Sequence, residues 1–398
     1  MNVLFLSSDY PPNTIGGVGI YLDQFARHLA KRGHQAYVIT ETEGTPCSYI
    51  DRGVRIWRIR REPVWWLEPA RQHAPQLVRR IEYSMAVART VREVLHRFSI
   101  DLVESCESRA EGFCHYLFNR RPPLFIKLHT PDGLIFPLNQ QPRSEDIGLM
   151  LLLEEWWLRR ATRLISLTNA VTQRVSTLYQ LDLNRIPKVH IPVDTTYFHV
   201  PPAGAPRELQ VLYVGRLEFR KGVHVLLRAI PHIMRHVPGV RFLFLGPDCG
   251  LRWLLERYQR DPRYGPQIVW RAWASREEVR QAYHQSRECV VPSLWDNHPT
   301  VCLEAMSAGC AVIGSRIGGI PEIIQHGATG VLVPPGSSRG LARAVVSLLT
   351  DHAAREALAA RARAEMEREF DVDIVFDETI TLYQGLLNGR SGHVPAET

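Results

Sequence analysis

The feature that most constrains the fold is an alternation of short apolar runs with amphipathic stretches, which occurs once in each half of the chain. The first half opens with the apolar run Val3–Ser7, continues with a helical pattern that ends near Gly33, and returns to an apolar run at 36–40. The second half restarts the pattern at Gln210. Further strands are expected at 54–59, 102–104, 124–129, 164–167, 188–191, 241–245, 268–270, 288–291 and 310–314. Strands that alternate with amphipathic helices indicate parallel β/α units, and 398 residues suffice for two such domains.

The segment 192–206, which lies between the halves, is rich in proline. Its composition is typical of an extended linker. We therefore place the domain boundary after residue 200, with a first domain at 1–200 and a second at 201–371. A last helix is expected at 372–387, and the residues from 388 onward are expected to fray.

The segment from Pro292 to Gly309 carries two carboxylates, Asp296 and Glu304, on either side of a predicted helix start. Pro299 suits the first helical position and Gly309 the residue after the last. Asp296 would then lie in the loop before the helix and Glu304 one turn inside it, so both can face one cleft. The helix N-terminus between them offers unpaired N–H groups to an anion. A nucleotide-sugar site requires carboxylates that bind hydroxyl groups and, beside them, a helix N-terminus that binds phosphate.

Composition excludes several other classes. No apolar run approaches the roughly 18 residues of a membrane span. Seven cysteines without a C-x-x-C pair argue against a disulfide framework or a zinc site. The net charge of +7 suits nucleic acid, anionic lipid or a phosphorylated substrate, but no nucleic-acid motif accompanies it. The N-terminus reads as a first strand rather than a signal peptide, which favours a cytoplasmic protein.

The acidic signature resembles that of the retaining glycosyltransferases of family 4. In that family an acidic residue is followed after seven residues by Glu-Ala-Met, then a Gly, and later Gly-Gly-x-Pro-Glu. The matching residues here are Asp296, Glu304-Ala305-Met306, Gly309 and Gly318-Gly319-Ile320-Pro321-Glu322. The resemblance runs nearly end to end and implies the GT-B fold: two Rossmann-like β/α/β domains that face each other across a cleft. It also implies that the last helix, within 372–398, crosses back to the N-terminal domain.

The resemblance further implies a donor site in the second domain. The residues that match the family's diphosphate-binding cations are Arg216 and Lys221, and Glu304 would accept hydrogen bonds from the ribose hydroxyls. Gly319 and Glu322 would line the pocket near the base or phosphates. Each residue also has a structural reading: a solvated basic loop for the two cations, an exposed helix carboxylate for Glu304, and a cap of its own helix for Glu322. The family usually has Glu where this chain has Asp296, which is shorter by one methylene, about 1.5 Å.

Two features of the first domain follow strands. Gly16-Gly17-Val18-Gly19 follows the first strand and opens a helix, but it is a poor dinucleotide fingerprint. We expect these glycines, Gly17 above all, to let the backbone approach the donor phosphates or the acceptor. His129 follows the strand at 124–129, where family members often have a His close to the transferred sugar; the alternative is a structural histidine.

Three other segments have competing readings. Asp371-Val372-Asp373 resembles a manganese-binding D-x-D, but its place at a helix start predicts an N-cap, and we expect no metal. The segment Arg58–Leu67 combines cations with Trp65 and Trp66, which suits contact with an anionic membrane, an acceptor-site wall, or ordinary packing. For Trp156-Trp157 we expect core packing.

Together these features predict a hexosyltransferase that takes a sugar from a UDP- or GDP-linked donor to a saccharide, lipid-linked or small-molecule acceptor. The nucleotide sugar is a substrate, and no further cofactor is expected. Arg216, Lys221, Asp296 and His129 would surround the reacting groups. A sugar-nucleotide 2-epimerase and a non-enzymatic sugar-nucleotide-binding subunit remain as alternatives. The protein is expected in the cytoplasm, with a possible peripheral place at the inner membrane face.

Overall fold

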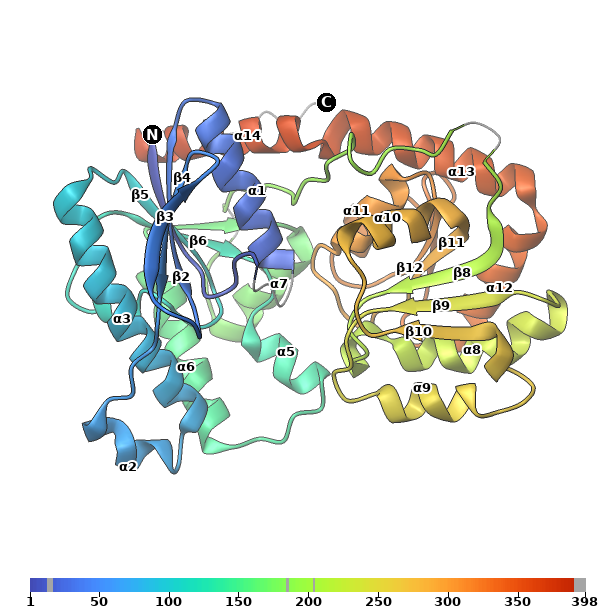
Figure 1. Ribbon diagram of the computed structural model, residues 1–398, viewed down its shortest axis with the longest axis horizontal. Coiled ribbons are helices and arrows are strands. Elements are labelled where there is room, and N and C mark those ends of the chain that lie inside the picture. Colours follow the sequence, from blue (N-terminus) through green and yellow to red (C-terminus); the bar gives the residue numbers. More distant parts are fainter. Residues whose placement is uncertain (13–16, 184–185, 203–204, 390–398) are drawn as a thin grey trace. The chain divides into compact units, whose positions relative to one another are not determined.

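A computed structural model describes residues 1–12, 17–183, 186–202 and 205–389 (Figure 1). The chain forms two compact units. Unit 1 contains residues 1–136, 141–190 and 376–398, and unit 2 contains residues 137–140 and 191–375. The expected linker therefore joins unit 2 from residue 191 onward. The reason is local pairing: Val193 donates to the carbonyl of Phe370 and accepts from Val372, and its side chain is buried.

Unit 1 is built on a seven-stranded sheet in the order β3-β4-β2-β1-β5-β6-β7 within the described residues. Neighbouring strands are parallel except β3, which pairs with β4 in the antiparallel sense. The strands are β1 (Asn2–Leu6), β2 (Gln35–Glu41), β3 (Cys47–Asp51), β4 (Val54–Ile59), β5 (Leu102–Cys106), β6 (Leu124–Leu128) and β7 (Arg163–Ser166). Parallel strands buried on both faces read as continuous apolar runs, as residues Val3–Leu6 of β1 do.

The helices of unit 1 connect these strands. They are α1 (Gly17–Lys31), α2 (Glu68–Arg71), α3 (Pro75–Arg97), α4 (Phe113–Tyr116), α5 (Asp132–Leu138), α6 (Glu145–Arg160) and α7 (Asn169–Tyr179). The predicted stop at Gly33 is confirmed, because Gly33 has a φ of +80° after the last turn of α1.

Unit 2 is built on a six-stranded sheet in the order β10-β9-β8-β11-β12-β13 within the described residues. Its strands are β8 (Glu208–Val214), β9 (Arg241–Leu245), β10 (Ile268–Arg271), β11 (Ser286–Val291), β12 (Ala311–Ser315) and β13 (Val331–Val333). Its helices are α8 (Val223–His236), α9 (Arg252–Gln259), α10 (Arg276–Gln285), α11 (Thr300–Ser307), α12 (Ser338–Thr350) and α13 (His352–Glu365). All six strands run parallel.

The last helix, α14 (Val372–Leu387), has the predicted bounds and begins in unit 2. From Phe376 onward it belongs to unit 1, where Phe376 packs against Phe25 and Tyr383 donates to Glu104 at 2.6 Å. The predicted return of the last helix to the N-terminal domain is therefore confirmed.

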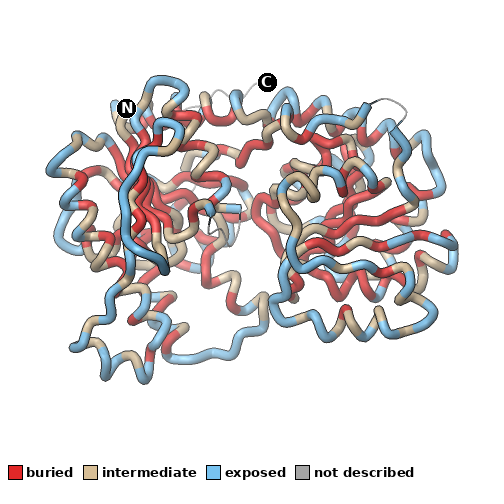
Figure 2. Tube along the Cα trace, in the orientation of Figure 1, coloured by how far each residue is buried: buried red, intermediate tan, exposed pale blue. Residues whose placement is uncertain are grey.

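The cores of both units lie along the sheets, where Figure 2 shows the strands as mostly buried. Two details differ from the sequence analysis. The strand expected at 188–191 is only an isolated bridge between Lys188 and Ser166, and β3 and β13 were not expected. β3 escaped notice because it is an edge strand whose residues are largely exposed. No helix in the described part of the chain is long and apolar enough to cross a membrane.

Candidate active site

The sheet of unit 2 has its topological switch point between β8 and β11. From β8 the chain proceeds to β9 and β10 on one side, whereas β11, β12 and β13 lie on the other. Ligands of open α/β sheets bind beyond the carboxyl ends of the strands at such a point. The loop after β8 carries Arg216 and Lys221, and the loop after β11 carries Asp296. The sheet order therefore brings the two motifs together.

Direct backbone contact holds the two loops against each other. Leu294 N–H donates to the carbonyl of Arg220 at 2.7 Å. Gly222 follows the 3-10 turn Phe219–Lys221 with a φ of +70°, and a Cβ placed on it would lie 1.9 Å from the carbonyl oxygen of Pro292. Only glycine tolerates both the left-handed conformation and this approach. Gly222, which directly follows Lys221, therefore sets the distance between the two loops.

Lys221 and Asp296 form an ion pair, with 2.6 Å between Nζ and Oδ2. Arg220 lies 3.7 Å from the other carboxylate oxygen, and Ser293 Oγ donates to Oδ2 at 3.3 Å. Burial acts to raise the pKa of Asp296, but Lys221 and Arg220 outweigh it, so the pKa lies below its usual range. The carboxylate is thus ionised, and it orients the ammonium group that the sequence assigned to the phosphates.

Arg216 is positioned by a second carboxylate in the same motif. Its Nη2 lies 3.2 Å from Glu218 Oε1, and Arg220 Nη2 lies 2.8 Å from that oxygen. Arg220 is buried and also donates to the carbonyl of Trp295 at 3.1 Å, whereas the Arg216 side chain remains 35% exposed. Glu218 and Arg220 therefore hold the loop, and Arg216 is the arginine that an incoming anion can reach.

Glu304 lies on α11, which begins after Pro299. Pro299 is the N-cap rather than the first helical residue, one position earlier than its predicted role. The predicted stop is confirmed: Gly309 has a φ of +67°, Gly309 N–H donates to Met306, and Cys310 N–H donates to Ala305, as in a Schellman motif.

The Glu304 carboxylate accepts a hydrogen bond from the hydroxyl of Tyr283 at 2.9 Å. Burial raises its pKa, although Tyr283 and then Arg276 act in the opposite direction. Tyr283 comes from α10 and is itself buried. A carboxylate with one oxygen held in this way can accept from a ligand hydroxyl through its remaining lone pairs.

Gly318 and Gly319 pack against the backbone of Asp296. Gly319 N–H donates to the carbonyl of Asp296 at 3.0 Å, and a Cβ on Gly318 would lie 2.0 Å from that oxygen. These glycines therefore support the Asp296 loop, and the N–H of Gly319 is already used. The alternative reading of Glu322 as the cap of its own helix assumed that a helix begins at Pro321, and that assumption is wrong. Ile320–Glu322 is a single 3-10 turn, because Ile323 and Ile324 turn into the core before the chain reaches β13. Glu322 is half-buried at the end of this turn.

The switch point of unit 1 lies between β1 and β5. Gly17 is the first residue of α1 and is exposed, whereas Gly16 lies outside the described residues. A close backbone approach within the unit is seen at Gly19, where a Cβ would lie 2.7 Å from the carbonyl oxygen of Asp9, and the approach of Gly17 to a ligand stays a prediction. The glycine segment thus opens a helix, as predicted, and Gly19 lets α1 pack on the loop that follows β1.

His129 follows β6, and its backbone N–H donates to the buried carboxylate of Glu107 at 2.9 Å. The His129 ring contacts the Tyr21 ring edge-on, with 5.8 Å between the centroids. Burial, and then the charge of Lys127, lower the pKa of His129 to about 3. The imidazole is therefore neutral near pH 7, and can exchange hydrogen bonds with a sugar hydroxyl without carrying charge.

Several residues at these two sites were not predicted from the sequence. Glu218 and Arg220 lie between the predicted Arg216 and Lys221, so their position in the loop would have indicated them. Glu107 directly follows β5 at the switch point, so strand order would have indicated it. Nothing in the sequence indicates Tyr283, because α10 is far from Glu304 along the chain.

The described residues contain no group of three or more His, Cys, Asp or Glu side chains placed to hold a metal ion. Asp371 has the predicted capping role at α14: its Oδ1 accepts from Asp373 N–H at 2.9 Å, and its Oδ2 from Thr195. Of the two tryptophans expected in the core, Trp157 is fully buried, whereas Trp156 is half-buried and packs against Phe113.

Two family models match the chain. "Glycosyltransferase Family 4" matches residues 15–197, and "Glycosyl transferases group 1" matches residues 208–351. The chain is 26% identical to the glycogen synthase of Mycobacterium tuberculosis over 98% of this chain and 96% of that protein. It is 24% identical to the D-inositol 3-phosphate glycosyltransferase of Mycobacterium marinum over 93% of this chain and 81% of that protein.

Solved structures show the same fold. Sucrose-phosphate synthase from Thermosynechococcus elongatus superposes with a TM-score of 0.80 at 20% identity, over 98% of this chain and all of that one. HepE from Anabaena, solved in complex with UDP, superposes with a TM-score of 0.72 at 19% identity, over 97% of this chain and all of that one. The chain is a glycosyltransferase of the GT-B class. It has two α/β units, a last helix that returns to unit 1, and an ion pair of Lys221 with Asp296 at the switch point of unit 2. The chain belongs to glycosyltransferase family 4.

Proposed function

We propose that the protein transfers a hexose from a nucleoside-diphosphate sugar to a saccharide or lipid-linked acceptor, with retention of the anomeric configuration. The observation that carries this proposal is the ion pair of Lys221 with Asp296 at the switch point of unit 2, with Arg216 on the same loop as Lys221 and Glu304 on the helix that follows the Asp296 loop. Anabaena HepE, which has the same fold, has been solved with UDP-glucose, and this supports a nucleotide-sugar donor here.

Arg216 and Lys221 would bind the diphosphate. An ammonium has three N–H donors and a guanidinium has five. Asp296 takes one donor of Lys221, and Glu218 takes one of Arg216, so each cation keeps donors for phosphate oxygens. Fixed cations stabilise the charge that develops on the leaving diphosphate. This arrangement requires no metal ion for departure of the nucleotide.

Glu304 would bind the ribose hydroxyls, and Tyr283 would keep its carboxylate in place. In the transfer step the bond between the anomeric carbon and the β-phosphate oxygen breaks. The acceptor oxygen bonds to the same face of the sugar, and its proton passes to the leaving phosphate. No side chain is required as a nucleophile in this scheme. Neutral His129 in unit 1 would hydrogen-bond the sugar or acceptor.

The first experiment is thermal stabilisation by UDP, GDP, ADP and dTDP without metal, for the wild type and Glu304→Ala. A shift with one nucleotide that Glu304→Ala abolishes supports the donor site and identifies the base. No shift with any of the four contradicts the proposal. With the matching NDP-sugar, NMR of the product at the anomeric carbon then tests retention; an inverted product contradicts that part. We include peripheral contact with an anionic membrane in the proposal, since a lipid-linked acceptor would require it.

A further inference from the structure

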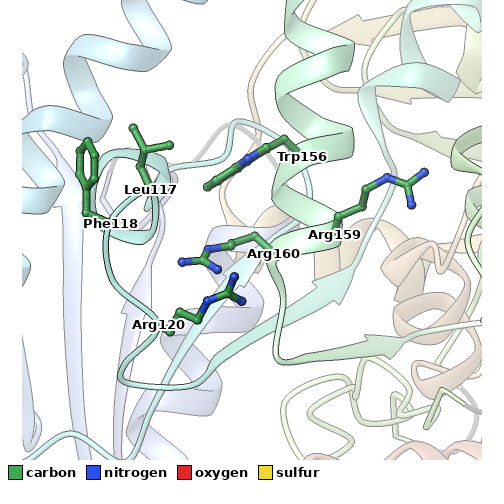
Figure 3. A pocket seen from close by; sticks show the side chains of 6 residues that line it. All are labelled: Leu117, Phe118, Arg120, Trp156, Arg159 and Arg160. Atoms are coloured by element: carbon green, nitrogen blue, oxygen red, sulfur yellow. The ribbon is translucent and has the colours of Figure 1, made fainter.

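Unit 1 contains an open hollow of about 460 Å³ that the proposed chemistry does not use (Figure 3). One wall comes from the segment after α4 and the other from the last turns of α6. The lining residues are Leu117, Phe118, Arg120, Trp156, Arg159 and Arg160. We call this set the basic-aromatic surface. It combines three arginines with two aromatic rings.

The positive charge of this surface is only partly balanced. Arg159 forms an ion pair with Glu155 at 2.8 Å. Arg160 instead donates to the carbonyls of Tyr116 and Asn119, at 2.7 and 2.8 Å. In the described part of the chain neither Arg120 nor Arg160 forms an ion pair, and Figure 3 shows their guanidinium groups beside each other. Two adjacent guanidinium groups without a carboxylate favour an anionic partner.

Leu117 and Phe118 face solvent, whereas Trp156 is half-buried and its ring packs against that of Phe113. Phe118 is 85% exposed and Leu117 43%. The apolar character continues along α6, where Leu149, Leu152 and Trp156 recur at spacings of three and four residues, and Leu152 is 63% exposed. Residues at these spacings share one helix face. An exposed apolar stripe that ends in arginines is typical of a helix that lies at a lipid–water interface.

We propose that the basic-aromatic surface, extended along α6 by Leu149 and Leu152, docks unit 1 on an anionic lipid bilayer. The arginines would contact lipid phosphates, while the exposed side chains of Phe118 and Leu152 enter the boundary between headgroups and acyl chains. A small free anion would engage the arginines but not Leu152, which lies a full turn from Trp156. This inference rests on the proposed function only for its choice of a lipid-linked acceptor, because docking and donor binding involve different residues.

The test is co-flotation of the full chain with vesicles of phosphatidylcholine alone and of phosphatidylcholine mixed with phosphatidylglycerol. An arginine at an anionic surface contributes about fivefold in affinity, so the charge reversal in Phe118→Ser/Arg120→Glu is expected to weaken binding by about 25-fold. The matched control is Trp65→Ser/Arg60→Glu. It removes an aromatic ring that is also 85% exposed and reverses an exposed arginine in the same unit. The control should bind as the wild type does.

A third variant, Leu152→Asp, separates a bilayer from a soluble anion. Loss of vesicle binding in Leu152→Asp supports docking on lipid. If inorganic phosphate displaces the protein from vesicles while Leu152→Asp binds normally, the surface is an anion site and the proposal is wrong. Equal binding to both kinds of vesicle, or no binding to either, also overturns it.

Two further readouts complete the design. If only the Trp65 control variant loses binding, the docking segment is the one around Trp65 and the proposal is wrong. If sedimentation velocity shows a wild-type dimer that Phe118→Ser/Arg120→Glu dissociates, the surface is a subunit interface instead. Thermal stabilisation by nucleotide should be unchanged in every variant, so failure of docking is distinguishable from failure of the donor site.

Discussion

Replacement of Lys221 by Met removes one partner of the ion pair with Asp296 and leaves a carboxylate that is only 9% exposed. Loss of one partner of a buried pair costs about 3–5 kcal/mol. The lower end applies here, because Arg220 and Ser293 remain within reach of the carboxylate and Lys221 itself is 22% exposed. We therefore expect the free energy of unfolding of unit 2 to fall by about 3 kcal/mol, which lowers Tm by about 6–12 °C for a unit of this size.

The double variant Lys221→Met/Asp296→Asn tests the cause of that loss. It removes the orphaned charge along with its partner, so it should be more stable than Lys221→Met, with a coupling of at least about 1 kcal/mol between the two sites. The assay is urea unfolding of the wild type, both single variants and the double variant. Additivity of the two single effects within about 0.5 kcal/mol would refute the ion pair as a stabilising contact.

Nucleotide binding by the same four proteins shows whether Lys221 binds the diphosphate or only stabilises the fold. If Lys221 binds the diphosphate, Lys221→Met and the double variant both lose thermal stabilisation by nucleotide, including the variant whose stability recovers. Asp296→Asn should retain part of it. A double variant that binds nucleotide as the wild type does would show that Lys221 only neutralises Asp296.

Three other predictions follow from the geometry. Gly222→Ala should destabilise unit 2 by far more than Gly239→Ala; both residues have a positive φ, but only Gly222 faces a carbonyl within 1.9 Å, and equal Tm losses would contradict this contact. His129 has a folded pKa of about 3, below its unfolded value, so its contribution to stability is present above about pH 6.5 and is lost as pH falls, by about 2 kcal/mol at pH 5. In urea unfolding, His129→Gln should lose about 2 kcal/mol less of its free energy of unfolding than the wild type does between pH 7.5 and 5. The same loss in both proteins would contradict the prediction. Tyr283→Phe should weaken nucleotide binding about tenfold, because it removes a charge-assisted hydrogen bond of about 1.5 kcal/mol to the Glu304 carboxylate. Calorimetric titration measures this, and full affinity would show that the hydroxyl does not position the carboxylate.

Local sequence signals were enough for most of the secondary structure. The strand at 54–59, the helix at 372–387 and the stop at Gly309 agree with the structure, because each depends on apolar periodicity or on the left-handed conformation that glycine permits. The sequence did not predict secondary structure correctly where contacts with residues distant in the chain determine it. β3 pairs with β4 although its side chains are exposed, and the turn at Ile320–Glu322 stops short because Ile323 and Ile324 are drawn into the core.

The candidate site likewise has one part that the sequence predicts and another that depends on tertiary contacts. The sequence by itself determined the candidate site: two carboxylates around a helix start, and two cations after a strand, are recognisable because their spacing along the chain carries the information. Only the tertiary structure decided which groups touch. Sheet order placed the loops after β8 and β11 together, so that Lys221 meets Asp296 across 75 residues, and α10 brought Tyr283 to Glu304. Partners so far apart in the chain share no local pattern, because the strands and helices between them set their distance.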